Sequence, residues 1–166
     1  MDVVATLDAP CAPAALLPWI EDLGRYPDWL DIVPRAVIAD AHAQDVGPAW
    51  SVDLRGRLGP FARAKRLRMV RTQHEGRHAR FERVEHDGRQ HAPWVLDADI
   101  AEVDGASRLT MRLHYGGRLW MPALDRLLAD EIERSRPRLL LRVGRSRRVR
   151  VRSALRTPPT RSGWSA

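Results

Sequence analysis

Two glycine turns in the middle of the chain constrain its fold more than any other feature of the sequence. Asp87-Gly88 and Asp104-Gly105 each suit a two-residue hairpin, because a type I′ turn requires positive φ at both central residues. The segments that flank these turns alternate apolar and polar side chains, as half-buried strands do. The sequence therefore predicts an antiparallel meander.

Each turn also predicts a register between its two strands. The first predicts three residue pairs: His86 with Arg89, Arg83 with Ala92, and Phe81 with Trp94. The second predicts five: Val103 with Ala106, Ile100 with Leu109, Ala98 with Met111, Leu96 with Leu113, and Trp94 with Tyr115. Both turns place one apolar set on a single face of the sheet. A slip of one residue would invert a whole strand, so this agreement in parity supports both turns.

The same alternation extends to the preceding segments. We expect strands at residues 3–8, 36–39, 63–72 and 79–85, and another that begins at Ala49. The side chains predicted to face the core are Val3, Ala5, Leu7, Trp50, Val52, Leu54, Lys65, Leu67, Met69, Arg71, Ala79, Phe81, Arg83 and Glu85. The predicted sheet is thus apolar on one face, with a few charged side chains directed inward.

Helical spacing occurs before and after the meander. Leu16, Trp19, Ile20 and Leu23 predict a short helix that ends at Gly24, and a second short helical turn follows at residues 26–30. A long helix is expected from about Pro122. Its apolar stripe is Leu124, Leu128, Ile132, Ser135 and Leu139, with Leu127 beside it. Pro137 should kink this helix or shift its last turn, and Gly144 should end it.

This order of elements predicts an α+β fold in which a curved antiparallel sheet wraps around a long C-terminal helix, with two short helices after the first strand. We expect one domain, residues 1–143, because 166 residues with 44% hydrophobic content can bury a single core. Residues 144–166 lack apolar periodicity and are rich in arginine, so they are predicted to be a disordered tail.

Over residues 1–143, this element order, with Tyr26-Pro-Asp-Trp29 after the first helix and the long helix at the end, resembles the START-like or polyketide-cyclase (SRPBCC) superfamily and its helix-grip fold. The resemblance implies a cavity between sheet and helix that binds a hydrophobic small molecule, such as a lipid, a sterol-like compound or an aromatic polyketide. The superfamily includes cyclases, dehydratases and plain carriers, so the fold does not name the chemistry.

The inward face supplies candidate ligand contacts. Its large side chains are Trp50, Met69, Phe81, Trp94, Met111 and Tyr115. Aromatic rings and methionine can accommodate a flat or flexible apolar ligand. The alternative is an ordinary filled core, which apolar stripes usually form.

Three charged side chains on this face, Arg71, Arg83 and Glu85, need an explanation, because an inward charge is costly unless it is paired or reaches solvent. Arg71 and Arg83 are candidate ligand contacts. In an enzyme, Arg83 would be the donor to a carboxylate or carbonyl, Glu85 its orienter or a general base, and Tyr115 a further proton-transfer candidate. Lys65 is expected to approach Glu85 from the preceding strand. The alternative is a structural salt bridge at the rim of the cavity.

Other chemistry is not indicated. The six histidines lack metal-ligand spacing, so no metal is expected. No glycine-rich phosphate loop and no Gly-x-Ser-x-Gly motif occurs, and Cys11 has no identifiable histidine partner. We therefore expect no cofactor and no covalent nucleophile.

The net charge of +7 is carried by the tail, where seven arginines follow Val143 without an acidic residue. The tail is a candidate for weak contact with nucleic acid or an anionic membrane, or it is simply solvated. Lys65 is the only lysine, a bias that coding rich in G and C would produce. The single cysteine, Cys11, and the absence of a signal peptide or an apolar span favour the cytoplasm.

The favoured function is binding or transfer of a hydrophobic, lipid-like or polyketide-like molecule in the cavity. The second hypothesis is a cofactor-independent cyclase or dehydratase that uses Arg83, Glu85 and Tyr115, and the third is association through the arginine tail. The sequence does not predict an oligomeric state.

Overall fold

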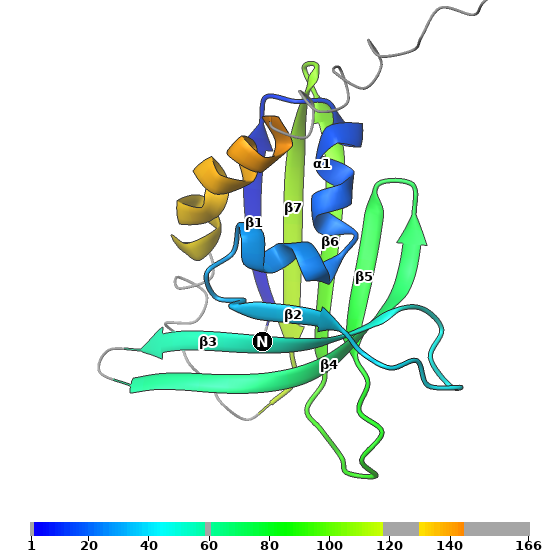
Figure 1. The fold of residues 1–166 in the computed structure, drawn as a ribbon. Helices are drawn as coiled ribbons and strands as arrows, with labels where there is room; N and C mark the ends of the chain where they lie inside the picture. The colour runs from blue at the N-terminus through cyan, green and yellow to red at the C-terminus, as the bar shows by residue number, and fades with distance from the viewer. Residues whose placement is uncertain (1, 59–60, 118–129, 145–166) are drawn as a thin grey trace, which may run out of the picture.

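The structure, a computed structural model, describes residues 2–58, 61–117 and 130–144. Seven antiparallel strands form one sheet in the order β1-β7-β6-β5-β4-β3-β2. The strands are β1 (Asp2–Ala9), β2 (Arg35–Ile38), β3 (Ala49–Leu58), β4 (Phe61–Glu75), β5 (His78–Arg83), β6 (Trp94–Val103) and β7 (Ala106–Tyr115). The sheet is strongly curved, so that β3 and β4 run across the view while β1, β7 and β6 run along it (Figure 1). The predicted strands are present, with shifted ends.

The β6–β7 hairpin has the predicted register. Val103 pairs with Ala106 and Trp94 with Tyr115, with the intervening pairs in step. Asp104 and Gly105 have φ of 50° and 76°, as a type I′ turn requires. The Asp104-Gly105 turn is therefore confirmed.

The predicted β5–β6 register is wrong by two residues. Phe81 pairs with Leu96 and not with Trp94, and the predicted pairs His86 with Arg89 and Arg83 with Ala92 do not form. Strand β5 ends at Arg83, and residues 84–93 form a loop. The prediction of a two-residue hairpin at Asp87-Gly88 is wrong, because Gly88 has a positive φ of 72° but Asp87 does not, and a type I′ turn requires it at both. The predicted register would have placed Pro93 inside the ladder, where it has no N–H to donate. Because the register is shifted by an even number of residues, the side chains of β6 that were predicted to face inward still do so.

The first helical region is divided differently from the prediction. Helix α1 (Pro13–Ile20) ends before Glu21, and Leu23–Asp28 forms a separate 3₁₀ helix, η1. The carboxylate of Asp22 accepts a hydrogen bond from the backbone N–H of Gly24 at 2.8 Å and so caps η1. Gly24 therefore lies within the second helix and does not end the first.

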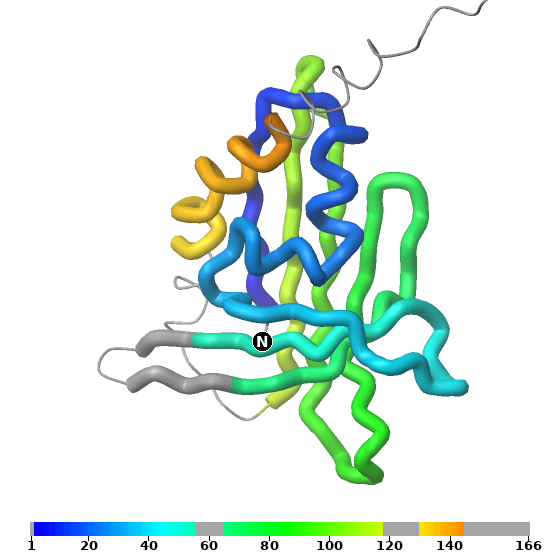
Figure 2. The backbone as a smooth tube through the Cα atoms, viewed as in Figure 1, coloured from blue at the N-terminus to red at the C-terminus, as the bar shows by residue number. Residues whose placement is uncertain are grey.

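The described part of the C-terminal helix spans residues 130–144 and runs through Pro137 without ending there. Ile132, Ser135 and Leu139 of the predicted stripe are buried. Figure 2 places this helix beside α1, on the same face of the sheet. The predicted helix start, Leu124, Leu127 and Leu128 lie outside the described residues, as does the tail from 145 onward. Gly144 is still helical.

Candidate functional site

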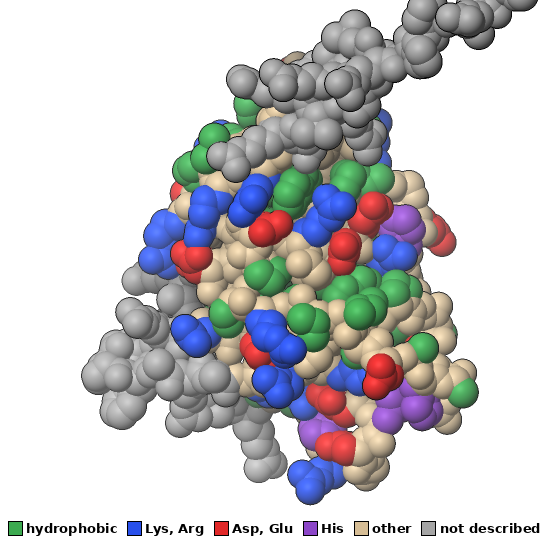
Figure 3. Space-filling view, in the orientation of Figure 1, with side chains coloured by type: hydrophobic (Ala, Val, Ile, Leu, Met, Phe, Trp, Pro, Cys, Tyr) green, Lys and Arg blue, Asp and Glu red, His purple; other side chains and the backbone are tan. Residues whose placement is uncertain are grey.

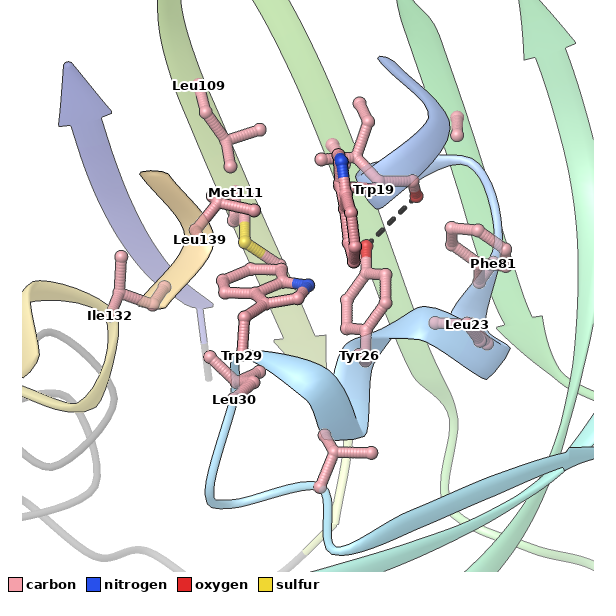
Figure 4. Packing of buried hydrophobic residues seen from close by; sticks show 14 of the residues in the cluster. Trp19, Leu23, Tyr26, Trp29, Leu30, Phe81, Leu109, Met111, Ile132 and Leu139 are labelled. Carbon is pink, nitrogen blue, oxygen red and sulfur yellow. Dashed lines mark hydrogen bonds between the residues drawn. The ribbon is translucent and has the colours of Figure 1, made fainter. Parts of the chain in front are cut away.

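Much of the space between the sheet and the helices is filled by two aromatic side chains of the η1 region. Tyr26 and Trp29 are the largest fully buried side chains, and their ring centres lie 5.3 Å apart. Figure 4 shows both rings between Met111 of the sheet and the side chains of α1 and η1. The phenol of Tyr26 donates to the carbonyl of Ile20 at 3.1 Å, and burial raises its pKa.

Four of the predicted ligand-lining side chains belong to this packed core. Trp50, Met69, Phe81 and Met111 are each at most 5% exposed and lie in one cluster with the helices. The ring of Phe81 meets those of Trp50 and Tyr26 edge-on, at 5.8 and 6.4 Å between centres. The indole N–H of Trp50 donates to Asp22 at 3.1 Å. These four residues have protein neighbours where a ligand was expected.

Arg71 also lies away from the other predicted charges. It faces Phe81 across the β4–β5 ladder, and its guanidinium donates to the backbone carbonyl of Glu21 at 2.8 Å. Glu21 is the C-terminal cap of α1, where a cation is favourable because the helix dipole ends there. This contact gives Arg71 a structural role in holding α1 against the sheet.

The remaining predicted residues come together around Lys65. The ammonium of Lys65 lies 5.2 Å from the ring centre of Trp94 and 5.4 Å from that of Tyr115, and those two rings are 4.8 Å apart. Lys65 belongs to β4, whereas Trp94 and Tyr115 pair across β6 and β7. We call Lys65, Arg83, Glu85, Trp94 and Tyr115 the Lys65 cluster.

Arg83 and Glu85 form the polar side of this cluster. The Nε of Arg83 donates to Glu85 at 2.8 Å, and Nη1 donates to the carbonyl of Ala92 at 3.4 Å. Nη2 lies 3.0 Å from Nδ1 of His91, which must be an unprotonated acceptor for this contact to be a hydrogen bond. Arg83 thus fastens the loop of residues 84–93 to the end of β5.

The cluster is rich in hydrogen-bond donors. Burial and the neighbouring charge of Arg83 lower the pKa of Lys65, and Glu85 partly opposes this effect. Lys65 forms no salt bridge with a carboxylate of the described residues. The buried indole N–H of Trp94 has no hydrogen-bond partner in the described part of the chain. Trp94 also packs against the hydrophobic core, so the cluster joins an apolar surface to unmatched donors.

The glycine pair after β7 makes room for this cluster. A Cβ at Gly116 would lie 2.5 Å from the ring of Pro93, and one at Gly117 would lie 1.9 Å from the hydroxyl of Tyr115. The backbone N–H of Gly116 donates to the carbonyl of Pro93 at 3.1 Å. The two glycines therefore permit a close approach directly after the end of β7.

A second charged group ties the C-terminal helix to the end of η1 and to the segment after it. Glu131 accepts from the backbone N–H of Asp31 at 2.8 Å, Arg138 pairs with Asp31, and Arg142 pairs with Asp28 at 3.3 Å. Basic and acidic side chains lie side by side over this helix in Figure 3. The hollow lined by Asp28, Arg138, Leu141 and Arg142 thus has charges that are already matched.

Comparison of whole structures relates this arrangement to known proteins. A START superfamily protein from Mycobacterium smegmatis superposes with a TM-score of 0.64 at 13% identity, over 87% of this chain and 97% of that one. The di-domain ARO/CYC protein StfQ of the steffimycin biosynthetic pathway gives 0.59 at 13% identity, over 88% of this chain and 51% of its own. Ara h 8.0201 gives 0.53 at 12% identity, over 87% and 95%. The chain has the helix-grip fold.

This assignment rests on structure alone, since the sequence matches no family model and no curated protein. Within the helix-grip fold, the Lys65 cluster lies on the inner face of the sheet, near the hydrophobic core. No helix in the described ranges is long and apolar enough to cross a membrane. The described residues also contain no group of three His, Cys, Asp or Glu side chains arranged to hold a metal ion.

Sequence reasoning treated Lys65 only as a neighbour of Glu85, and it missed the contact with the two rings. A signal was present: the one lysine among 28 basic residues occupies an inward position of the alternating pattern. Tyr26 and Trp29 carry part of the family resemblance, but the sequence pattern does not predict that they fill the space between sheet and helices. Two aromatic residues three positions apart in a short helical turn were the available signal.

Proposed function

We propose that this chain binds a small hydrophobic molecule on the inner face of its sheet, at the Lys65 cluster. The observation that carries the proposal is the stack of Lys65 over Trp94 and Tyr115 at the partly exposed margin of a packed core. A lysine at the margin of a core, without a carboxylate partner among the residues that the structure describes, is unusual for a purely structural role, because burial of an unpaired charge is costly. A ligand bound against the two rings would account for this arrangement.

Carrier function is the first candidate. The fold is one that typically holds hydrophobic ligands, and the Lys65 cluster joins aromatic surface to a few polar groups, as small-molecule sites do. The test is native mass spectrometry of the purified full chain, followed by organic extraction. We expect a co-purifying apolar compound or saturable binding of N-phenyl-1-naphthylamine. A protein that is empty and binds neither this neutral probe nor its anionic analogue 8-anilinonaphthalene-1-sulfonate would refute the proposal.

Catalysis is the second candidate, favoured by the proximity of Glu85, Arg83 and Tyr115 to the same surface. These groups would act as acid, base or carbonyl-orienting donor in a cyclase or dehydratase. The extracted compound, returned to the protein, would separate the two functions: a carrier releases it unchanged, whereas an enzyme alters its mass. Arg83→Met should weaken binding modestly in a carrier and abolish turnover in an enzyme.

A further inference from the structure

The Lys65 cluster also indicates which class of hydrophobic molecule it would hold. Its acidic member is already engaged: Glu85 Oε1 accepts from Arg83 Nε at 2.8 Å and from the backbone N–H of Arg68 at 3.2 Å. Lys65 has ring faces but no carboxylate among the described residues as its partner. With two cations and one carboxylate, the cluster carries one positive charge in excess.

The indole of Trp94 has the same need for an acceptor. The indole N–H of Trp94 is buried without an acceptor in the described ranges, and a buried donor without a partner is costly. Indole nitrogen donates only and an ammonium donates only. A group that brings acceptor oxygens therefore suits the donor chemistry of this cluster.

The surroundings of these donors are apolar. Leu54 lies opposite Lys65 in the β3–β4 ladder, and Leu96 is two residues from Trp94 on the same face. Both leucines are partly buried and pack against the core. An ion in this setting is screened less by solvent than one on the surface, so a charge-assisted hydrogen bond to Lys65 would be stronger there.

We infer that the Lys65 cluster selects a hydrophobic organic acid, with Lys65 in direct contact with its anionic oxygen and the rings of Trp94 and Tyr115 against its apolar body. This inference rests on the proposed function and adds to it the charge of the ligand. It also assigns the chain's only lysine a role that an arginine would fill less well, because a planar guanidinium and a compact ammonium differ in geometry.

Two fluorescent probes of similar shape test the inference. 8-Anilinonaphthalene-1-sulfonate is anionic, and N-phenyl-1-naphthylamine is its neutral counterpart. In titrations of the full chain, we expect Lys65→Met to weaken binding of the anionic probe by about tenfold or more, the scale of one charge-assisted contact, and to leave binding of the neutral probe nearly unchanged. Arg66→Met is the matched control, because Arg66 is the adjacent cation on the opposite, exposed face of β4.

Acylation of the unaltered protein is a second test that does not depend on folding of a variant. N-acetoxysuccinimide can modify only one lysine, so peptide mass reports the rate at Lys65. The anionic probe should slow this rate relative to the α-amino group. The inference is overturned if Lys65→Met weakens binding of both probes equally or of neither. It is also overturned if the anionic probe does not slow the acetylation of Lys65. If the unaltered chain binds neither probe, the proposed function fails together with the inference.

Discussion

Arg68 and Asp45 form a two-pronged ion pair in which Nη1 and Nη2 of the arginine lie 2.9 and 2.7 Å from the two carboxylate oxygens. The Asp45 side chain is only 4% exposed. The same carboxylate accepts from the backbone N–H of His42 at 2.8 Å and lies 3.2 Å from Nε2 of His86. This pair joins the loop before β3 to β4 and to the loop after β5.

The stability contributed by Asp45 should depend on pH. The Arg68 hydrogen bonds, with smaller contributions from His42 and His86, outweigh the opposing effect of burial and hold the pKa of Asp45 well below its usual range. A lowered folded pKa stabilises the fold above the unfolded value of about 3.9, and the effect is lost as pH falls through the folded pKa. Asp45→Asn should therefore lower the urea midpoint at pH 7.

The difference between Asp45→Asn and the unaltered protein should shrink below about pH 4, where the unfolded carboxyl takes up its proton. Glu75→Gln, at an exposed position, is the control and should change the midpoint little at any pH. A difference for Asp45→Asn that stays constant between pH 7 and pH 3 would contradict the assignment.

The packed core and the Lys65 cluster should respond differently to truncation. Phe81 is fully buried against Tyr26 and Trp50, so Phe81→Ala should cost about 3–5 kcal/mol in the free energy of unfolding. Trp94 is only partly buried, and Trp94→Ala should cost less. Binding of N-phenyl-1-naphthylamine, compared at equal folded fractions, should be weakened more by Trp94→Ala than by Phe81→Ala. Equal effects of both variants on binding would argue against a separate site.

Gly117 provides a steric test of the Tyr115 position. An alanine there would clash with the phenol of Tyr115, so the ring would have to leave the position in which it contacts Trp94 and Lys65. We expect Gly117→Ala to weaken binding of the neutral probe. In a Tyr115→Ala background the clash disappears, so adding Gly117→Ala should then have little further effect. Additive losses in this double-mutant cycle would contradict the contact.

Glu131 should be the main fastening point of the C-terminal helix among its described residues. The Glu131 side chain is 10% exposed and accepts from the backbone N–H of Asp31 at 2.8 Å. Glu131→Ala would leave that N–H without its partner and should cost about 1–3 kcal/mol in chemical denaturation. Glu133 is on the same helix, and its side chain is 67% exposed. Glu133→Ala should therefore change the free energy of unfolding very little. A similar loss for both would contradict a special role for the contact between Glu131 and the Asp31 N–H.

Local sequence determined which side chains face inward. The alternation along each strand has a period of two, and Asp104-Gly105 can adopt the positive φ angles of its turn without help from the rest of the chain. Both are properties of short segments. For this reason Phe81, Met69, Lys65 and Arg83 could be placed on one face before their neighbours were known.

Tertiary structure decided which of these side chains meet. The β5–β6 register depends on where Pro93 is tolerated in the ladder, and the approach of Lys65 to Trp94 and Tyr115 depends on curvature of the sheet across several strands. Neither is encoded in a single segment. Tyr26 and Trp29 fill the space between sheet and helix only once both layers are present, so only the assembled fold separates the packed core from the Lys65 cluster.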